Sequence, residues 1–554
     1  MMTNRVLIKY GDIAVGAKDE FSLEATEKED FSDVNQIKVE TQFQKYVNPI
    51  ESYSAALDGE SLPIPTDVDK AEIGWWSKQI TDDYGNFENP IILTATAENL
   101  YSSIGITFKF DFVNNVFPRK IGISWYRGDI LISQKDFYPN NFFYLCQNSV
   151  EYYNKIVVSF YSLNMPKSRL KVHSIEYGFG AEFEGDELQN VGIVQQISPI
   201  SAEIPINTCE FLLKSKRNIE FSFQERQKVE TYFYGRLRAK TFVKGFKRKS
   251  RNHWSVTTED YIGIMDSVSF FGGIYENKNA LELLGEIFSS AKVPYSVQEG
   301  CFESTYVSGY IPLVSCRDAL KHVCFAIGAS VDTSNRDDVY VYKLSNDVSQ
   351  HVPLNRIMQG QSFEVGANVT AVELTAHSYK PIDDQRTLYE AEKSGVGNEI
   401  LVRFSEPIHS LSVSSGEILD SGANYAIINA GSNCVLVGKK YEHSQATHRK
   451  TNPLVLTTDL ENIISINDAT LVSENNVDNL LEICYNYLVK TQKVNLKIIE
   501  ARKKENDEIV YDGAVNIGDF IEAETEYMGD VVGHVIQQSY SLNGGIIVKD
   551  TVIR

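Results

Sequence analysis

The stretch YNKIVVSFYSLNMPKSRLKVHSIEYGFG, residues 153–180, decides the fold class of this chain. In its first half apolar residues alternate with others, so Ile156, Val158 and Phe160 fall on one face of an extended strand. The turn sequence NMPK follows at 164–167. A second apolar run comes after the turn, and its phase slips by one along Leu170, Val172, Ile175 and Tyr177. The pattern predicts a pair of strands around a turn, and nothing in it is typical of catalysis.

Similar short runs fill the N-terminal third of the chain. The further strand candidates lie at 91–95, 105–110, 120–125, 130–133 and 142–145. Turn sequences such as DYGN at 83–86 and YPNN at 138–141 separate them, and helical periodicity is almost absent. Short strands at this spacing predict a sandwich or jelly roll, which we assign to residues 46–180. We interpret residues 1–45 as an N-terminal arm, or as an edge that joins another domain or protein.

The remainder of the chain is also mainly β, with one change of pattern. Glycines and acidic residues at 178–186 indicate a boundary, and more strands follow over 181–270. Helical periodicity then appears at 277–290 and at 315–328, which predicts a small α/β module over 271–350. The second helix has a capping serine, an acidic capping-box residue and a terminal glycine, at Ser315, Asp318 and Gly328. Residues 351–554 are expected to be mostly β with one helix at 473–490.

Composition narrows the classes of function. The formal net charge of -21 among 554 residues makes binding to free DNA an improbable main role, because an acidic surface repels nucleic acid. The 7 cysteines form no C-x-x-C pair, so we interpret them as reduced thiols in a protein made in a cytoplasm. The N-terminus does not resemble a signal peptide, and no apolar run is long enough to predict a transmembrane helix.

Catalytic and cofactor motifs are not found. The sequence contains neither a phosphate-binding G-x-x-x-x-G-K-[ST] loop nor a G-x-S-x-G nucleophile motif. The closest histidines, His443 and His448, are five residues apart and are interpreted as part of a polar loop. Folding could bring two of the many carboxylates to glycosidase spacing, which a sequence cannot reveal. We therefore predict no enzymatic activity, no metal and no cofactor, and interpret the tripeptide RGD at 127–129 as a turn.

The most unusual local feature is the basic stretch RLRAKTFVKGFKRKSR at 236–251, which contains no acidic residue. Its basic residues are Arg236, Arg238, Lys240, Lys244, Lys247, Arg248, Lys249 and Arg251. In an acidic chain such a strand would suit docking to an acidic neighbour, including another copy of the chain. A solvated hairpin is the open alternative. Contact with nucleic acid ranks third, because few stacking aromatics lie nearby.

With these residues considered, a resemblance to a known family becomes visible. Residues from about 50 to 180 resemble the discoidin-type, galactose-binding-like jelly roll of tail proteins from phages and prophages of Gram-positive bacteria. The segments that carry it are ENPIILTATAENLYSSIGITFKFD (88–111), KIGISWYRGD (120–129) and NKIVVSFYSLNMPKSRLKVHSIEYG (154–178). The resemblance implies that the last strands close a sandwich and pass the chain to the next domain.

The rest of the chain resembles baseplate-hub or tail-tip proteins of the same phages. The segments are GIVQQISPISAEIPINTCEFLL (192–213), FFGGIYENKNALELLGEIF (270–288), GYIPLVSCRDALKHVCFAIGASVDT (309–333), VRFSEPIHSL (402–411) and IGDFIEAETEYMGDVVGHVIQQSYSLNGG (517–545). The resemblance implies hub-type β-barrels from 185–270 and 355–554, with the 271–350 module outside them. It also implies a homotrimeric ring in which the basic strand meets a neighbouring subunit.

The same resemblance defines the expected partners and place. They are the tail tube or distal tail protein, a tip or spike protein, and DNA only as it passes through the tail channel. The chain would be part of a virion tail or tailocin assembled in the host cytoplasm. An alternative is a peripheral protein whose jelly roll binds a host surface glycan, because sugars stack on aromatic rings. The candidates are Trp75, Trp76, Tyr84 and Tyr126, for which core packing is the competing interpretation. A glycan hydrolase is the third hypothesis.

Overall fold

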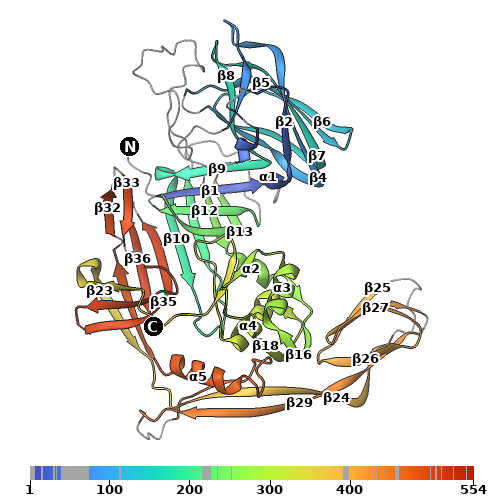
Figure 1. Cartoon of the computed structure of the whole chain (residues 1–554), viewed down its shortest axis with the longest axis vertical. Coiled ribbons are helices and arrows are strands. Elements are labelled where there is room, and N and C mark those ends of the chain that lie inside the picture. Colours follow the sequence, from blue (N-terminus) through green and yellow to red (C-terminus); the bar gives the residue numbers. More distant parts are fainter. Residues whose placement is uncertain are drawn as a thin grey trace. The chain divides into compact units, whose positions relative to one another are not determined.

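The structure is a computed structural model, and it describes most of the chain (Figure 1). The described residues are 6–13, 17–28, 32, 34–38, 74–111, 114–214, 226–233, 235–250, 253–390, 399–431, 433–455, 461–499, 501–505, 508–512, 515–527, 529–543 and 546–554. Much of the predicted arm, residues 46–73 of the predicted jelly roll, and Arg251 lie outside them. The chain forms two compact units: residues 8–183 with 227–229, and residues 1–7, 184–226 and 230–554. The division at 183/184 lies close to the expected boundary at 180/181.

The first unit is a curled β-sheet with the strand order β3-β8-β4-β7-β5-β6, and β2 pairs with β4. Its strands are β2 (Ser22–Ala25), β3 (Trp75–Ile80), β4 (Asn86–Phe110), β5 (Pro118–Arg127), β6 (Ile130–Phe137), β7 (Phe143–Leu163) and β8 (Arg169–Glu176). The short helix α1 (Ala17–Glu20) precedes β2. Because β2 pairs with β4, this part of the predicted arm is a strand of the sheet.

The two strands of the opening stretch are present, but they do not pair with each other. β7 and β8 both pair with β4, which lies between them. The register of β4 shifts repeatedly between Thr96 and Gly105, so the strand bends there. Phe108 beyond the bend consequently meets Phe160 edge-on, with ring centroids 6.0 Å apart. The curl of the sheet thus encloses an aromatic core.

The phase slip noticed in the sequence has a structural cause. On β8 the register with β4 jumps from Ser174 to Val172, which leaves His173 as an extra residue. A bulge of this kind moves the following side chains to the other face of the strand. Val172 and Ile175 therefore pair with Phe110 and Phe108, and all four side chains join one core.

The second unit is built on a long sheet with the order β23-β31-β36-β35-β10-β11-β14-β13-β12. Its strands are β10 (Leu188–Gln196), β11 (Thr208–Lys214), β12 (Lys228–Phe233), β13 (Arg236–Ser250), β14 (His253–Glu259), β23 (Ile357–Val365), β31 (Gln492–Ile498), β35 (Gly529–Asn543) and β36 (Ile546–Ile553). β34 (Phe520–Thr525) pairs with β35, and β22 (Gln350–Val352) pairs with β34. Since β10 pairs with β35, the two predicted barrel regions share one sheet.

An α/β module follows β14. Its helices are α2 (Tyr261–Asp266), α3 (Ala280–Ala291) and α4 (Cys316–Ile327). Its strands are β15 (Ser269–Phe270), β16 (Gly273–Asn279), β17 (Tyr295–Val297), β18 (Tyr306–Ile311), β19 (Val314–Ser315), β20 (Ser330–Asp332) and β21 (Val339–Tyr342). The caps of α4 are as predicted: the Ser315 hydroxyl accepts from the Asp318 amide, and Gly328 has φ 65°.

A two-stranded ribbon, which the sequence did not indicate, extends from the same unit (Figure 1). It consists of β24 (Ala371–Glu390) and β29 (Val435–Thr451), and helix α5 (Val477–Leu488) packs on its base. β30 (Ile463–Ile466) pairs with β24. Short strands at the far end are β25 (Glu399–Arg403), β26 (Ile408–Val413), β27 (Gly416–Ser421) and β28 (Tyr425–Ala430), which enclose a small separate core. β32 (Ala501–Glu505) and β33 (Glu508–Asp512) form a hairpin.

Candidate interaction surfaces

The first half of the basic strand β13 is engaged inside its own unit. Arg238 is buried, and its guanidinium lies 5.2 Å from the ring centre of Tyr540, to whose hydroxyl it donates at 3.3 Å. Lys240 forms an ion pair with Asp337. The Arg236 guanidinium is 3.5 Å from an amide oxygen of the loop before β34. Arg238 and Lys240 are thus engaged within their own unit, whereas Arg236 stays partly exposed.

The second half of β13 is different, because it extends beyond the core. Lys244 pairs with Glu259 at 2.6 Å, and the Arg248 guanidinium covers the buried Trp254 ring at 4.8 Å. In the β13–β14 ladder Lys247 lies opposite Ser255, and the Ser255 side chain points away from the core in which Trp254 is buried. Lys249 is the extra residue of a bulge.

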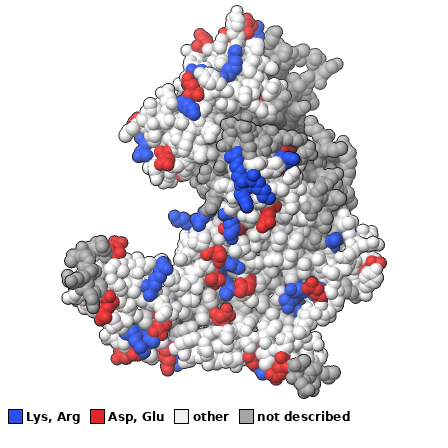
Figure 2. Space-filling model, turned by 180° about the vertical axis from the view of Figure 1, so that it is seen from behind, with Lys and Arg blue, Asp and Glu red and all other residues white. Residues whose placement is uncertain are grey.

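Lys247 and Lys249 are both exposed, and within the described part of the chain neither has an ion-pair partner. Figure 2 shows that Lys and Arg lie beside acidic residues over most of one face, with one larger basic group. We refer to Lys247 and Lys249 as the hairpin lysines.

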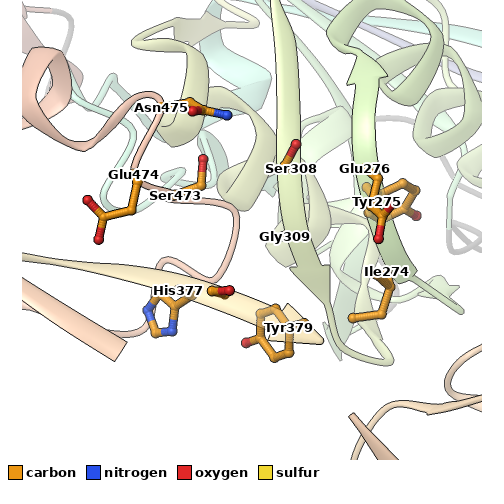
Figure 3. Close-up of a pocket in the computed structure, with 11 residues that line it drawn as sticks. Ile274, Tyr275, Glu276, Ser308, Gly309, His377, Tyr379, Ser473, Glu474 and Asn475 are labelled. Carbon is orange, nitrogen blue, oxygen red and sulfur yellow. The ribbon is translucent and has the colours of Figure 1, made fainter. Parts of the chain in front are cut away.

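A pocket of about 210 Å³ lies where the ribbon meets the α/β module (Figure 3). Its residues come from three places in the fold: β16 and β18, the base of β24, and the loop before α5. They are Ile274, Tyr275, Glu276, Ser308, Gly309, His377, Ser378, Tyr379, Ser473, Glu474 and Asn475. Gly309 has φ 145°, and a Cβ there would lie 2.3 Å from the Thr470 carbonyl oxygen, so only glycine permits this close approach.

Stacked rings form the base of the pocket. Tyr379 lies parallel to His443 on the paired strand, with ring centroids 4.5 Å apart. His377 is buried, and its Nδ1 is 2.9 Å from Nε2 of His443. Burial lowers the pKa of both histidines, and the neighbouring His443 lowers that of His377 further. The two imidazoles are joined by a hydrogen bond between ring nitrogens. His443 and His448 lie on β29, not in the polar loop that we expected.

Two acidic residues border the pocket, and the Glu474 carboxylate is turned away from it. Glu276 and Glu474 are exposed and lie on opposite sides of it (Figure 3). The Glu474 carboxylate is 3.3 Å from Nε2 of His448, whereas Glu276 has no ion pair among the described residues. Sequence reasoning missed this pocket, because its parts are up to two hundred residues apart and follow no motif.

The residues considered for glycan binding divide into two groups. Trp75 and Trp76 are 0% and 5% exposed. Trp75 packs on Phe160 in the core of the curled sheet, and the Lys171 ammonium lies 4.3 Å from the ring centre of Trp76. A sugar cannot reach either ring, so the structure corrects the prediction for these two residues. Tyr84 is 79% exposed in a turn, and Tyr126 is half-buried beside Lys155.

An unexpected feature of the first unit is a buried ion pair. The Lys171 ammonium is 3.1 Å from the Asp111 carboxylate, and the side chains are 1% and 2% exposed. The carboxylate also accepts from the backbone and side-chain amides of Asn114, at 3.0 and 2.8 Å. Burial lowers the pKa of Lys171 to about 7. This pair lies where β8 adjoins the end of β4.

The described residues also bear on metal, thiol and membrane sites. No group of three or more His, Cys, Asp and Glu side chains there could hold a metal ion. Six of the cysteines are buried, and all seven are free thiols. Burial raises the thiol pKa, for example to about 11 for Cys316, which is typical of unreactive core residues. In the described part of the chain, no helix combines the length and apolarity needed to cross a membrane.

Comparison with known proteins finds likenesses of fold only. No family pattern and no curated protein matches the sequence. Three solved structures illustrate the likeness. The prophage MuSo2 43 kDa tail protein from Shewanella oneidensis is 8% identical, with a TM-score of 0.43, over 68% of this chain and 94% of that one. The tail protein from Neisseria meningitidis MC58 is 9% identical, with a TM-score of 0.41, over 67% and 93%. Prophage tail protein gp18 from Listeria monocytogenes EGD-e is 10% identical, with a TM-score of 0.35, over 67% and 90%.

Proposed function

We propose that the chain is a structural protein of a phage tail or tailocin, located in the baseplate or tail tip. In this role it forms an oligomeric hub that connects the tail tube to the tip or spike. The observation that supports the proposal is the long sheet of the second unit. Strands from 188–259 and from 492–553 lie in that one sheet, and an α/β module is inserted between them in the sequence. This is the order of parts that the sequence resemblance to hub proteins implies.

The proposed role is carried by surfaces and not by a reaction. The cores contain well-packed apolar and aromatic side chains, and most basic residues of β13 support the fold of their own subunit. Such a rigid β framework suits a connector whose partners are other copies of the chain, the tube or distal tail protein, and the tip protein. We expect no enzymatic activity and assembly in the cytoplasm of the bacterial host.

A peripheral, glycan-binding role is the second candidate. The observation that favours it is the 79% exposure of Tyr84 in a turn of the first unit. An exposed ring of this kind is suited to stacking on a sugar face. Titration of the chain with host surface glycan should then change the NMR signals of Tyr84 and leave a Tyr84→Ala variant without response.

Immunogold electron microscopy tests the proposed location. Antibody against the purified chain is applied to phage or tailocin particles from the bacterium that encodes it. Label at the tail end supports a baseplate or tail-tip position, whereas particles that carry no label refute the role in the tail. Light scattering and class averages of the purified chain test the ring. A closed ring in the class averages supports the hub. In the immunogold images, label along the outer fibres favours the peripheral alternative.

A further inference from the structure

The strands at the far end of the ribbon form a lobe with a core of its own (Figure 1). We define the lobe as the described residues of 382–440, which include β25, β26, β27 and β28. Its core contains Val402, Ile428 and Leu436, and it is separate from the core of the α/β module and from the core that α5 shares with the base of the ribbon. A lobe with its own core can keep its fold when its contacts to the module are broken.

The ribbon is the first of two attachments of the lobe. Its register breaks where the lobe begins, because Pro381 lies opposite Tyr441 but Gln385 lies opposite Lys439. Three residues of β24 therefore face one residue of β29, and a bulge of this kind bends a strand. The base of β24 is buried in the core that it shares with α5, whereas residues 378–386 are half-buried or exposed. The ribbon is thus fixed at its base and can bend at the bulge.

The second attachment depends on one buried side chain. Asn424 donates to the carbonyl oxygens of Phe271 and Ile311 at 2.7 and 2.9 Å, and its amide oxygen accepts from the hydroxyl of Tyr310 at 2.8 Å. The ring of the adjacent Tyr425 lies 4.3 Å from the ring of Phe271. In the described part of the chain, every hydrogen bond between the lobe and the α/β module involves Asn424. We refer to these five residues as the latch.

The contact between lobe and module is polar and incompletely packed. When the lobe moves away, water can replace the hydrogen bonds of Asn424, so their net contribution is much smaller than their gross strength. Phe271 is already 37% exposed, so its ring pair covers little apolar surface. The pocket of about 210 Å³ between the ribbon and β18 shows that these surfaces do not pack closely along their length (Figure 3).

We propose that the lobe is a hinged part of the second unit, which bends at the bulge of the ribbon and is held against the α/β module by the latch. In the docked position Asn424 satisfies the two carbonyl oxygens of the module. In the released position these carbonyls and the ring of Phe271 face water, and the lobe stays folded around its own core. Such a two-position element allows another protein to select one position by binding it more tightly. The inference does not depend on the proposed role in a tail.

Double electron–electron resonance on the full chain measures the position of the lobe. Spin labels are attached through Glu299→Cys in the module and Glu417→Cys in the lobe, two exposed positions. The half-buried Cys301 is replaced by serine, and the other six cysteines are buried, which protects them from the label. In the unaltered latch we expect one dominant distance, which corresponds to the docked lobe.

The latch is then weakened from the side of the module, with Tyr310→Phe and Phe271→Ala, so that the sequence of the lobe is unchanged. One hydrogen bond to Asn424 and one ring pair are lost together. The ratio of released to docked lobe should therefore rise at least about tenfold, and a second, broader distance component should appear.

The matched control is Tyr306→Phe with Tyr295→Ala. It also removes a tyrosine hydroxyl and a partly exposed ring from the module, because Tyr295 is 41% exposed and stacks on Phe288 at 4.4 Å, and neither residue belongs to the latch. The control should keep the single distance. Hydrogen exchange over β28 establishes whether the lobe remains folded in each variant.

Three outcomes would overturn the proposal: the same single distance in the latch variant and in the unaltered latch, an equal change in the control, or a lobe that loses its exchange protection in the latch variant and so unfolds instead of moving. The test uses purified protein, so its result is independent of whether antibody labels a tail.

Discussion

The buried pair of Lys171 and Asp111 allows a quantitative test of how the first unit is stabilised. We consider Lys171→Met, which keeps the length of the side chain and removes its charge. At pH 6 the lysine is protonated, because its pKa of about 7 lies above that pH. The substitution then leaves the Asp111 carboxylate buried without a countercharge, although its two hydrogen bonds from Asn114 remain.

The size of the effect follows from the burial of both side chains. Removing one member of a buried ion pair typically costs about 3–5 kcal/mol, since the remaining charge stays in a medium of low polarity. The two amide donors to Asp111 stabilise the carboxylate, so we expect the lower end, about 3 kcal/mol of unfolding free energy. Replacing both members, as in the double variant Lys171→Met with Asp111→Asn, removes the unpaired charge and should recover most of that loss.

Urea unfolding followed by tryptophan fluorescence measures this effect in the full chain. Three of the 4 tryptophans, Trp75, Trp76 and Trp125, belong to the first unit, so the signal mainly reports its unfolding. The matched control is Lys120→Met. That lysine also pairs with a carboxylate, at 2.7 Å, and also lies over an aromatic ring, at 4.8 Å, but the pair is exposed. The control should change the midpoint far less.

Two results would refute this reasoning. If Lys171→Met and Lys120→Met shift the midpoint equally, burial does not determine the strength of the pair. If the double variant is as unstable as Lys171→Met, the loss comes from packing against Trp76 and not from an unpaired carboxylate.

Two further predictions concern other parts of the chain. Asn424 is fully buried and donates to the carbonyl oxygens of Phe271 and Ile311 at 2.7 and 2.9 Å. Asn424→Ala should therefore speed hydrogen exchange over 399–430 at least tenfold, which corresponds to a loss of about 1.4 kcal/mol in the free energy of local opening. Exchange in α4 should stay unchanged. Gly328→Ala places a Cβ at φ 65°, which should destabilise the second unit by about 1–2 kcal/mol in thermal unfolding, and an unchanged melting temperature would contradict the assigned helix end.

Local features of the sequence predicted local structure well. The caps of α4 lie within a few residues of the helix that they end, so Ser315 and Gly328 could be assigned from the sequence alone. The phase slip after Leu170 likewise corresponds to a bulge at His173. The groups that form the helix caps are neighbours in the chain, so spacing is sufficient to predict their geometry.

Contacts between distant segments could not be predicted in the same way. The pairing of β10 with β35 joins strands more than three hundred residues apart, and no periodicity specifies which strands become neighbours. The burial of Lys171 depends on Asp111, which another strand brings beside it. A lysine between apolar residues looks in the sequence like the solvent-facing member of a strand. Only the fold of β4 over β8 reveals that both faces are covered.

The basic stretch at 236–251 shows why composition finds a surface but does not define it. All eight residues looked equivalent in the sequence, yet the register of β13 gives the described ones different roles. Arg238 and Arg248 lie over aromatic rings, Lys240 and Lys244 pair with carboxylates, and the hairpin lysines remain exposed. A positive charge that already has a partner in its own subunit cannot also attract a neighbour without breaking that contact. The number of basic residues therefore overstates how many are available to a neighbour, and among the described residues the exposed hairpin lysines have no ion-pair partner.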